Sequence, residues 1–93
     1  MTRTKNLKVY VRVNVSFRPD GVMIPTGLFW EDGRLYEIDK VTDICQAAAM
    51  KAGGQGDRYT IEVNGKSTYL FFERSTAITG NVIGRWFVER RVA

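Results

Sequence analysis

Hydrophobic and polar residues alternate strictly near the start of the chain. Across residues 8–18 every second residue is apolar, and most of these are valines. A period of two places apolar side chains on one face of a β-strand and polar side chains on the other, and β-branched residues favour extended backbone. The pattern therefore predicts a half-buried strand whose polar face carries Tyr10 between Lys8 and Arg12.

Turn residues divide the rest of the chain into extended segments. Pro19-Asp20-Gly21 ends the first strand, because proline fixes one backbone dihedral and glycine readily adopts positive φ. Asp32-Gly33 and Asn64-Gly65 each separate two apolar runs, a pattern typical of two-residue hairpin turns. Pro25 falls inside the extended segment 22–30 and restricts it to an edge or a bend, since proline donates no hydrogen bond to a ladder. Two hairpins are therefore predicted.

The stretch of residues 38–52 admits two interpretations. Its apolar residues follow helical spacing and its alanine-rich end precedes Gly53-Gly54, which favours a short helix near residues 43–52. In contrast, the stretch leaves the preceding turn as an alternating strand and contains β-branched residues that are poor helix formers. We favour a strand that bends near Asp39-Lys40 and continues to about Ala47, with the short helix as the alternative.

These segments, with a final strand over residues 85–90, add up to five or six strands in a chain of 93 residues. Such a chain is too short for two independent cores, so we expect one domain over residues 1–93. The segments predict an all-β fold, either a small five- or six-stranded barrel or a compact sandwich, and closure would remove aggregation-prone edges. Residues 53–56 are expected to form a flexible loop and residues 75–84 a polar connection.

The same alternation predicts the hydrophobic core. The side chains expected inside are Val9, Val11, Val13, Val15, Phe17, Leu28, Trp30, Leu35, Tyr36, Ile38, Val41, Ile44, Ile61, Val63, Leu70, Phe72, Trp86 and Val88.

The composition is ordinary but the charge is uneven. With 44% hydrophobic and 26% charged residues, the chain matches globular proteins rather than disordered or fibrous ones. Of the formal charge of +4, residues 1–18 contribute +5 and residues 85–93 contribute +2, whereas the segment between them carries −3. If the first and last strands are neighbours, the two basic ends form one positive face suited to phosphate. The alternative is a basic strand and terminus that only face solvent.

The absence of histidine and the presence of a single cysteine, Cys45, exclude most catalytic devices. A histidine base, a Ser-His-Asp triad and a thiolate zinc cluster cannot be assembled from this chain. The acidic residues fit no calcium-loop spacing, and those near the turns are explained by the turns. We therefore predict a protein that is not an enzyme and uses no metal or cofactor. Cys45, among apolar and small residues, is expected to be a buried, inert thiol.

No segment of the chain predicts export or membrane insertion. The longest apolar runs are a few residues long, well short of the roughly 20 residues that span a bilayer. The first residues do not resemble a signal peptide, and one cysteine forms no internal disulfide. These features favour a cytoplasmic location without membrane contact.

Three segments carry a resemblance to a known family. They are the hairpin Trp-Glu-Asp-Gly-Arg at residues 30–34, the Lys-Ala-Gly-Gly-Gln-Gly motif at residues 51–56, and Arg-Trp-Phe-Val-Glu at residues 85–89. With these motifs the chain resembles a family of small uncharacterised bacterial all-β proteins over residues 22–74 and 85–91. The resemblance implies a stand-alone barrel of the Src-homology-3-like kind, and it brings no catalytic residues.

The basic ends suggest a first candidate site. Its residues are Lys8, Tyr10, Arg12, Arg85, Arg90 and Arg91. Aromatic rings stack with bases while neighbouring cations bind phosphates, so this set predicts contact with nucleic acid. We therefore favour a non-catalytic small β-barrel binding module whose preferred ligand is nucleic acid. The alternative is a protein-protein interaction or self-assembling domain, forming a homo-oligomer or binding a protein partner through exposed aromatic residues such as Phe29, Phe71 and Phe87.

The glycine-rich segment suggests a second candidate site for a ligand or partner. Its residues are Lys51, Gly53, Gly54, Gly56 and Arg58. Glycines let backbone N–H groups approach an anion, and the two cations would flank it. The spacing matches neither a P-loop nor a dinucleotide fingerprint. A mobile connection between strands or a loop that contacts a partner are the alternatives.

Overall fold

The computed structural model describes residues 5–49, 54–74 and 83–92, which form one antiparallel sheet. Its strands are β1 (Lys5–Phe17), β2 (Met23–Phe29), β3 (Leu35–Glu37), β4 (Lys40–Ala49), β5 (Gly54–Val63), β6 (Lys66–Arg74) and β7 (Gly84–Val92). The described part of the chain contains no helix, so the predicted all-β, barrel-like fold is confirmed. The short helix considered near residues 43–52 is wrong over 43–49, which belong to β4, while residues 50–52 lie outside the described ranges.

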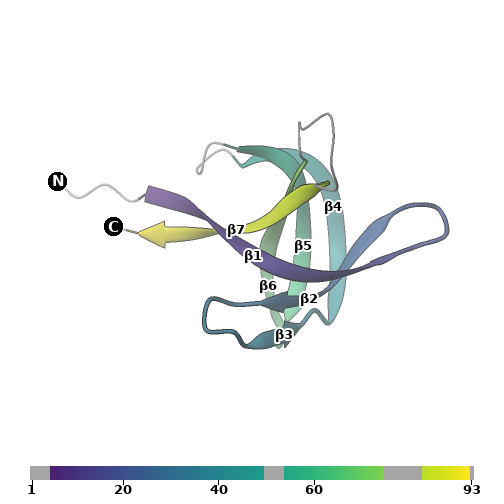
Figure 1. The fold of residues 1–93 in the computed structure, drawn as a ribbon, viewed down its shortest axis with the longest axis horizontal. Helices are drawn as coiled ribbons and strands as arrows, with labels where there is room; N and C mark the ends of the chain where they lie inside the picture. The colour runs from purple at the N-terminus through teal and green to yellow at the C-terminus, as the bar shows by residue number, and fades with distance from the viewer. Residues whose placement is uncertain (1–4, 50–53, 75–82, 93) are drawn as a thin grey trace.

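The order of the strands brings the first and last strands together. The sheet follows the order β3-β2-β1-β7-β6-β5-β4, and β1 pairs with β7 from Lys5↔Val92 to Val11↔Trp86. Figure 1 shows the start of β1 beside the end of β7. The condition under which the two basic segments were expected to meet is therefore fulfilled.

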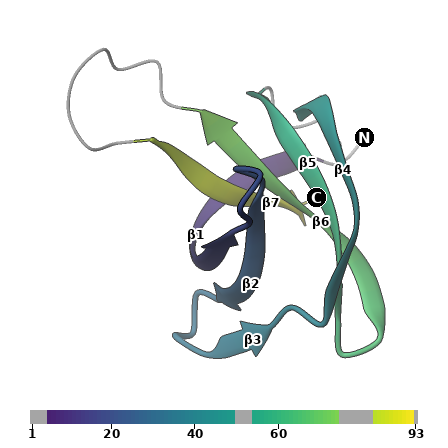
Figure 2. The same ribbon diagram turned by 90° about the vertical axis from the view of Figure 1, so that its right-hand side faces the viewer.

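The sheet curls into a half-barrel whose two edge strands, β3 and β4, are joined at one end (Figure 2). At this junction the backbone N–H of Ile38 donates to the Thr26 carbonyl of β2 at 3.0 Å, and that of Asp39 donates to the Glu62 carbonyl of β5 at 2.8 Å. The chain thus bends close to where a bend was predicted, but the expected single strand becomes β3 and β4. The sheet has seven strands rather than five or six, and β4 ends it with an edge that no described strand covers.

Turns occur at all three predicted places, each with a glycine at positive φ. The turn at Asp32-Gly33, however, is a three-residue loop over residues 31–33, closed by the Trp30 N–H donating to the Arg34 carbonyl at 2.9 Å. Gly21, Gly33 and Gly65 have φ of 88°, 81° and 78°, and Asn64 has φ of 53°. Two successive residues at positive φ are the hairpin geometry that matches the twist of paired strands, and Asn64-Gly65 joins β5 to β6 in this way. Pro25 lies at a register shift between β1 and β2 and outside the residues of β2 that pair with β3, so β2 has a neighbour on one side only at this proline, as the predicted edge position requires.

The main core lies inside the curve of the half-barrel. The predicted core residues found there are Val9, Val11, Val13, Leu28, Trp30, Ile38, Val41, Ile61, Val63, Leu70, Phe72, Trp86 and Val88. Tyr59 also belongs to this core, although it was not predicted. Most of the prediction is therefore confirmed, because alternation identifies the face of a strand that turns inward.

Four predicted core residues are exposed instead. Val15 and Phe17 lie beyond Val11, the last residue of β1 that pairs with β7, so only β2 neighbours them. Leu35 and Ile44 belong to the edge strands β3 and β4. The predicted Tyr36 is half-buried and lies outside the cluster. Alternation does not reveal how far the opposite wall of a half-barrel extends.

Gly54 and Gly56 belong to a strand, so the flexible loop predicted over residues 53–56 is wrong for the residues described. Gly56 pairs with Ala47 of β4, and a Cβ atom at this glycine would collide with the carbonyl oxygen of Phe72 in β6. The glycine is therefore required by the close approach of a neighbouring backbone rather than by a turn.

Candidate nucleic-acid interface

The side of the sheet opposite the main core is referred to below as the outer face. Its residues in β1, β5, β6 and β7 include Lys8, Tyr10, Arg12, Arg58, Tyr69, Phe71, Glu73, Arg85, Phe87 and Glu89. Cross-strand pairing sets Tyr10 beside Phe87 and Phe87 beside Phe71, and the same row continues to Arg58. Directly opposed residues have side chains close enough to touch, so this row forms a continuous surface across four strands.

The Glu73 carboxylate lies at the centre of a hydrogen-bond cluster on the outer face. Lys8 Nζ donates to Oε2 at 2.7 Å, and Arg85 donates to Oε1 at 2.9 Å. The Tyr10 hydroxyl lies 3.2 Å from Oε1 and 3.3 Å from Oε2. Donors from β1 and β7 thus converge on one acidic side chain of β6. They lower the pKa of Glu73, the hydrogen bond from Lys8 most strongly, so the carboxylate is charged at neutral pH.

Each exposed tyrosine of the outer face carries a guanidinium group over its ring. Arg85 Cζ lies 4.0 Å from the ring centre of Tyr10, and Arg58 Cζ lies 4.7 Å from that of Tyr69. Tyr10 is 43% exposed and Tyr69 is 50% exposed. These contacts are cation–π interactions, which attract the guanidinium groups to the faces of the aromatic rings.

Phe71 and Phe87 form a second, smaller core on this face. Their rings stack with centres 5.1 Å apart, and the side chains are 3% and 0% exposed. Lys8 Nζ lies 5.0 Å from the centre of the Phe87 ring, and Tyr10 packs against its edge. The prediction that these two phenylalanines are exposed for a partner is therefore wrong. The third residue of that prediction, Phe29, is half-buried under the guanidinium of Arg12.

Two polar atoms of the outer face are buried without a hydrogen-bond partner among the described residues. They are Nε of Arg58 and Oε2 of Glu89. Glu89 lies across from Lys8 in the pairing of β1 with β7, so its charge opposes part of the positive charge there. The outer face is thus less basic than the sequence segments predicted.

The structure brings together part of the first predicted site. Lys8, Tyr10, Arg12 and Arg85 share the outer face. Arg90 does not, because it pairs with Leu7 and its guanidinium forms an ion pair of 3.0 Å with Glu31, in the turn between β2 and β3. Arg85 and Arg90 differ by an odd number of positions in the sequence, which already predicts that their side chains lie on opposite faces of one strand.

The remaining predicted residues are divided between strands and segments that lie outside the described ranges. The backbone of Arg91 pairs with Asn6, which places it at the end of β7. Lys51 and Gly53, in the second predicted site, lie outside the described residues, while Gly54, Gly56 and Arg58 belong to β5. The described glycines therefore form no anion-binding loop, and Arg58 contributes to the outer face instead.

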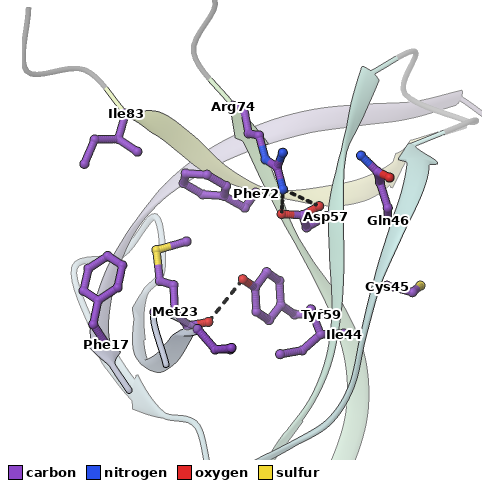
Figure 3. A pocket seen from close by; sticks show the side chains of 12 residues that line it. Phe17, Met23, Ile44, Cys45, Gln46, Asp57, Tyr59, Phe72, Arg74 and Ile83 are labelled. Carbon is purple, nitrogen blue, oxygen red and sulfur yellow. Dashed lines mark hydrogen bonds and ion pairs between the residues drawn. The ribbon is translucent and has the colours of Figure 1, made fainter. Parts of the chain in front are cut away.

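A hollow of about 430 Å³ lies between the β1–β2 hairpin and strands β4 to β6 (Figure 3). Phe17 and Met23 line one side of it, and Ile44 and Tyr59 line the other. The Tyr59 hydroxyl donates to the carbonyl oxygen of Met23 at 3.2 Å, and burial raises the pKa of this hydroxyl. The hollow is mainly apolar, and it exposes hydrophobic side chains at the open end of the half-barrel.

Charged and sulfur-containing side chains also border the hollow. Arg74 and Asp57 form an ion pair of 3.0 Å at its border. Cys45 also lines it and is half-buried rather than buried as predicted. Within residues 5–49, 54–74 and 83–92, no three histidine, cysteine or acidic side chains are placed to hold a metal ion.

Comparison with known proteins assigns no family to the chain. The described ranges include no helix that is long and apolar enough to cross a membrane. The resemblance to small bacterial all-β proteins stays a prediction from sequence. No protein-family model, no curated protein and no solved structure matches the chain.

Proposed function

We propose that this protein binds single-stranded nucleic acid through the outer face. The observation that carries the proposal is the guanidinium of Arg85 lying 4.0 Å above the ring of Tyr10, both side chains being exposed. A guanidinium plane and a tyrosine ring are both surfaces on which an unpaired base stacks. The second pair, Arg58 over Tyr69, offers another such surface on the same face.

The charges of the outer face support a ligand with phosphates. Among the described side chains that β1, β5, β6 and β7 place on this face, the cations are Lys8, Arg12, Arg58 and Arg85, and the carboxylates are Glu62, Glu73 and Glu89, of which Glu62 forms an ion pair of 3.5 Å with Lys40 of β4. The cations outnumber the carboxylates, so a modest positive charge remains. Binding is therefore expected to combine stacking with a limited number of phosphate contacts, and to weaken as salt is raised.

Fluorescence anisotropy with labelled oligonucleotides tests this proposal. Single-stranded DNA and RNA are expected to bind more tightly than a duplex of the same length, since bases in a duplex are not free to stack. Tyr10→Ala removes a stacking surface worth about 1–3 kcal/mol per base, which corresponds to a loss of roughly 5- to 150-fold in affinity. Arg12→Gln is expected to weaken binding by several-fold and to reduce its salt dependence.

Arg90→Gln is the matched control, because it removes one positive charge from the opposite side of the sheet. It should leave the affinity within about twofold of the unmodified protein. The proposal is wrong if no oligonucleotide binds at low salt, or if Arg12→Gln and Arg90→Gln weaken binding equally.

The uncovered edge of β4 favours a second candidate function, self-association of two copies. Residues 44–49 of this strand carry no charge, and Ile44 is exposed beside the hollow. Unprotected edge strands readily pair with another strand, and pairing two copies about a twofold axis uses the same edge twice. Because residues 44–49 are uncharged, two β4 strands from two copies of the chain can pair here without charge repulsion. A second copy is therefore the partner that we propose for this edge.

Light scattering tests self-association directly. A dimer should be present, and Ile44→Lys should convert it to a monomer because an inward-pointing charge is a device that blunts edge strands. Lys66→Glu, in the exposed β5–β6 turn region, is a control that changes charge away from this edge. A monomer at all concentrations would exclude this function and leave nucleic-acid binding unaffected.

A further inference from the structure

The donors around Glu73 are arranged as in an anion-binding site, and the Glu73 carboxylate occupies the position of the anion. A lysine ammonium, an arginine guanidinium and a tyrosine hydroxyl lie 2.7 to 3.3 Å from the two oxygens of one carboxylate. The donors belong to Lys8 and Tyr10 in β1 and Arg85 in β7, whereas the acid comes from β6. All three side chains also bind phosphate in proteins, and for the same reason, since they donate to anionic oxygens.

The carboxylate is accessible enough to be displaced. The side chain of Glu73 is 22% exposed, and that of Arg85 is 60% exposed. Arg85 is fixed against the Tyr10 ring, and Lys8 against the Phe87 ring, independently of their bonds to Glu73. The donors therefore have other contacts that hold them in place when the carboxylate leaves.

We propose that the Lys8, Tyr10 and Arg85 side chains form a phosphate-binding site in which Glu73 is a built-in competitor, and that the site selects a terminal phosphate. This inference rests on the proposed nucleic-acid function, because it assigns one part of the ligand to one part of the outer face. It identifies Glu73, which has no local signal in the sequence, as a specificity-determining residue.

The selection follows from the charge and oxygen count of the competing groups. An internal phosphodiester has one negative charge and two free oxygens, as the Glu73 carboxylate does, so exchanging one for the other brings little advantage. A terminal phosphate has three free oxygens and a charge near −2 at neutral pH, because its second pKa is about 6. It can accept from all three donors with greater charge, so it displaces the carboxylate where an internal phosphate does not.

The experiment compares oligonucleotides that differ only in a terminal phosphate. Single strands of one sequence, with 5′-phosphate, 3′-phosphate or only hydroxyl ends, are titrated against the unmodified protein and Glu73→Gln by anisotropy, with the label placed internally. The unmodified protein should bind at least one phosphorylated strand about tenfold more tightly than the hydroxyl strand. Glu73→Gln should bind the hydroxyl strand more tightly than the unmodified protein does, so that this preference becomes small.

The outcomes separate this inference from the function on which it rests. Binding of all three strands with equal affinity by the unmodified protein would overturn the terminal-phosphate site but keep nucleic-acid binding. Weaker binding of the hydroxyl strand by Glu73→Gln would show that the carboxylate positions the cations and would also overturn the inference. No binding of any strand would refute the proposed function itself.

If circular dichroism shows that Glu73→Gln is unfolded, Arg85→Gln replaces it in the experiment. Arg85→Gln should abolish the preference for the phosphorylated strand, whereas an unchanged preference would contradict the site.

Discussion

The side chains of Lys8 and Glu73 form an ion pair of 2.7 Å although 65 positions separate them in the chain. The pair joins β1 to β6 across the intervening strand β7, with Lys8 lying over the ring of Phe87. It therefore does two things at once, covering an aromatic ring and neutralising part of the positive charge of the outer face. Both effects lead to measurable predictions.

Glu73 should make the stability of the protein depend on acid pH. Its donors lower its pKa in the folded state below the ordinary value of 4.5, so the folded chain binds fewer protons at this site than the unfolded chain. The stabilisation is complete above the ordinary pKa and is lost as the pH falls through the lowered folded value. Urea unfolding of the unmodified protein should therefore lose more free energy than Glu73→Gln between about pH 6 and about pH 3. Equal losses in the two proteins would contradict this account.

Phe87→Ala should be strongly destabilising even though Phe87 lies outside the main core. The side chain is fully buried and stacked on Phe71, so truncation removes apolar burial and leaves a cavity. The free energy of unfolding should fall by about 3–5 kcal/mol. Tyr69→Ala is the control, since this aromatic residue on the same face is half exposed and its loss should cost less than half as much. Similar urea midpoints for the two variants would mean that the outer cluster contributes little.

Gly56→Ala should destabilise the protein more than Gly33→Ala. The new methyl group at residue 56 would meet the backbone of Phe72, which cannot rotate away, so β5 and β6 must separate. We expect a loss of about 3 kcal/mol there. At residue 33 the methyl group meets nothing, and only the positive φ of 81° is strained, at a cost of about 1 kcal/mol. Thermal unfolding followed by circular dichroism should place Gly33→Ala between the unmodified protein and Gly56→Ala, and the reverse order would refute the close approach.

Tyr59→Phe should lower stability by about 1 kcal/mol. The substitution keeps the ring in the core but removes the hydroxyl that donates to the Met23 carbonyl at 3.2 Å, which links β5 to β2 across the hollow. Tyr36→Phe is the matched control, because among the described residues the Tyr36 hydroxyl has no such partner. A melting temperature for Tyr59→Phe equal to that of Tyr36→Phe would show that this link does not stabilise the fold.

Local patterns predicted the strands well because their causes are local. The alternation over residues 8–18 and the Asn64-Gly65 turn depend on side-chain period and on φ preferences of single residues, and the structure has both. The choice of strand over helix for residues 43–49 was also correct, since the preceding hairpin leads directly into the sheet. Gly56 was misread as part of a loop because its role depends on the backbone of β6, which is distant in sequence.

The residues of the candidate site likewise divide into those with a local sequence signal and those that depend on contacts between distant strands. Tyr10 between Lys8 and Arg12 was evident from alternation, and Arg85 followed from the neighbouring position of the first and last strands. Glu73 has no local signal, since its partners come from strands that only the topology brings beside it. The burial of Phe87 was likewise unpredictable, because lysine and tyrosine side chains from another strand cover it, and Phe71 is stacked on its ring.

The sequence by itself determined the all-β class, the turns, most of the inward-facing residues and the basic character of the first and last strands, because period, φ preference and charge are properties of short segments. The tertiary structure alone decided which strands lie side by side and so combine their cations, which carboxylate neutralises them, which aromatic rings are covered and where the half-barrel stays open. These features depend on contacts between residues far apart in the chain, and their geometry exists only after the strands have paired.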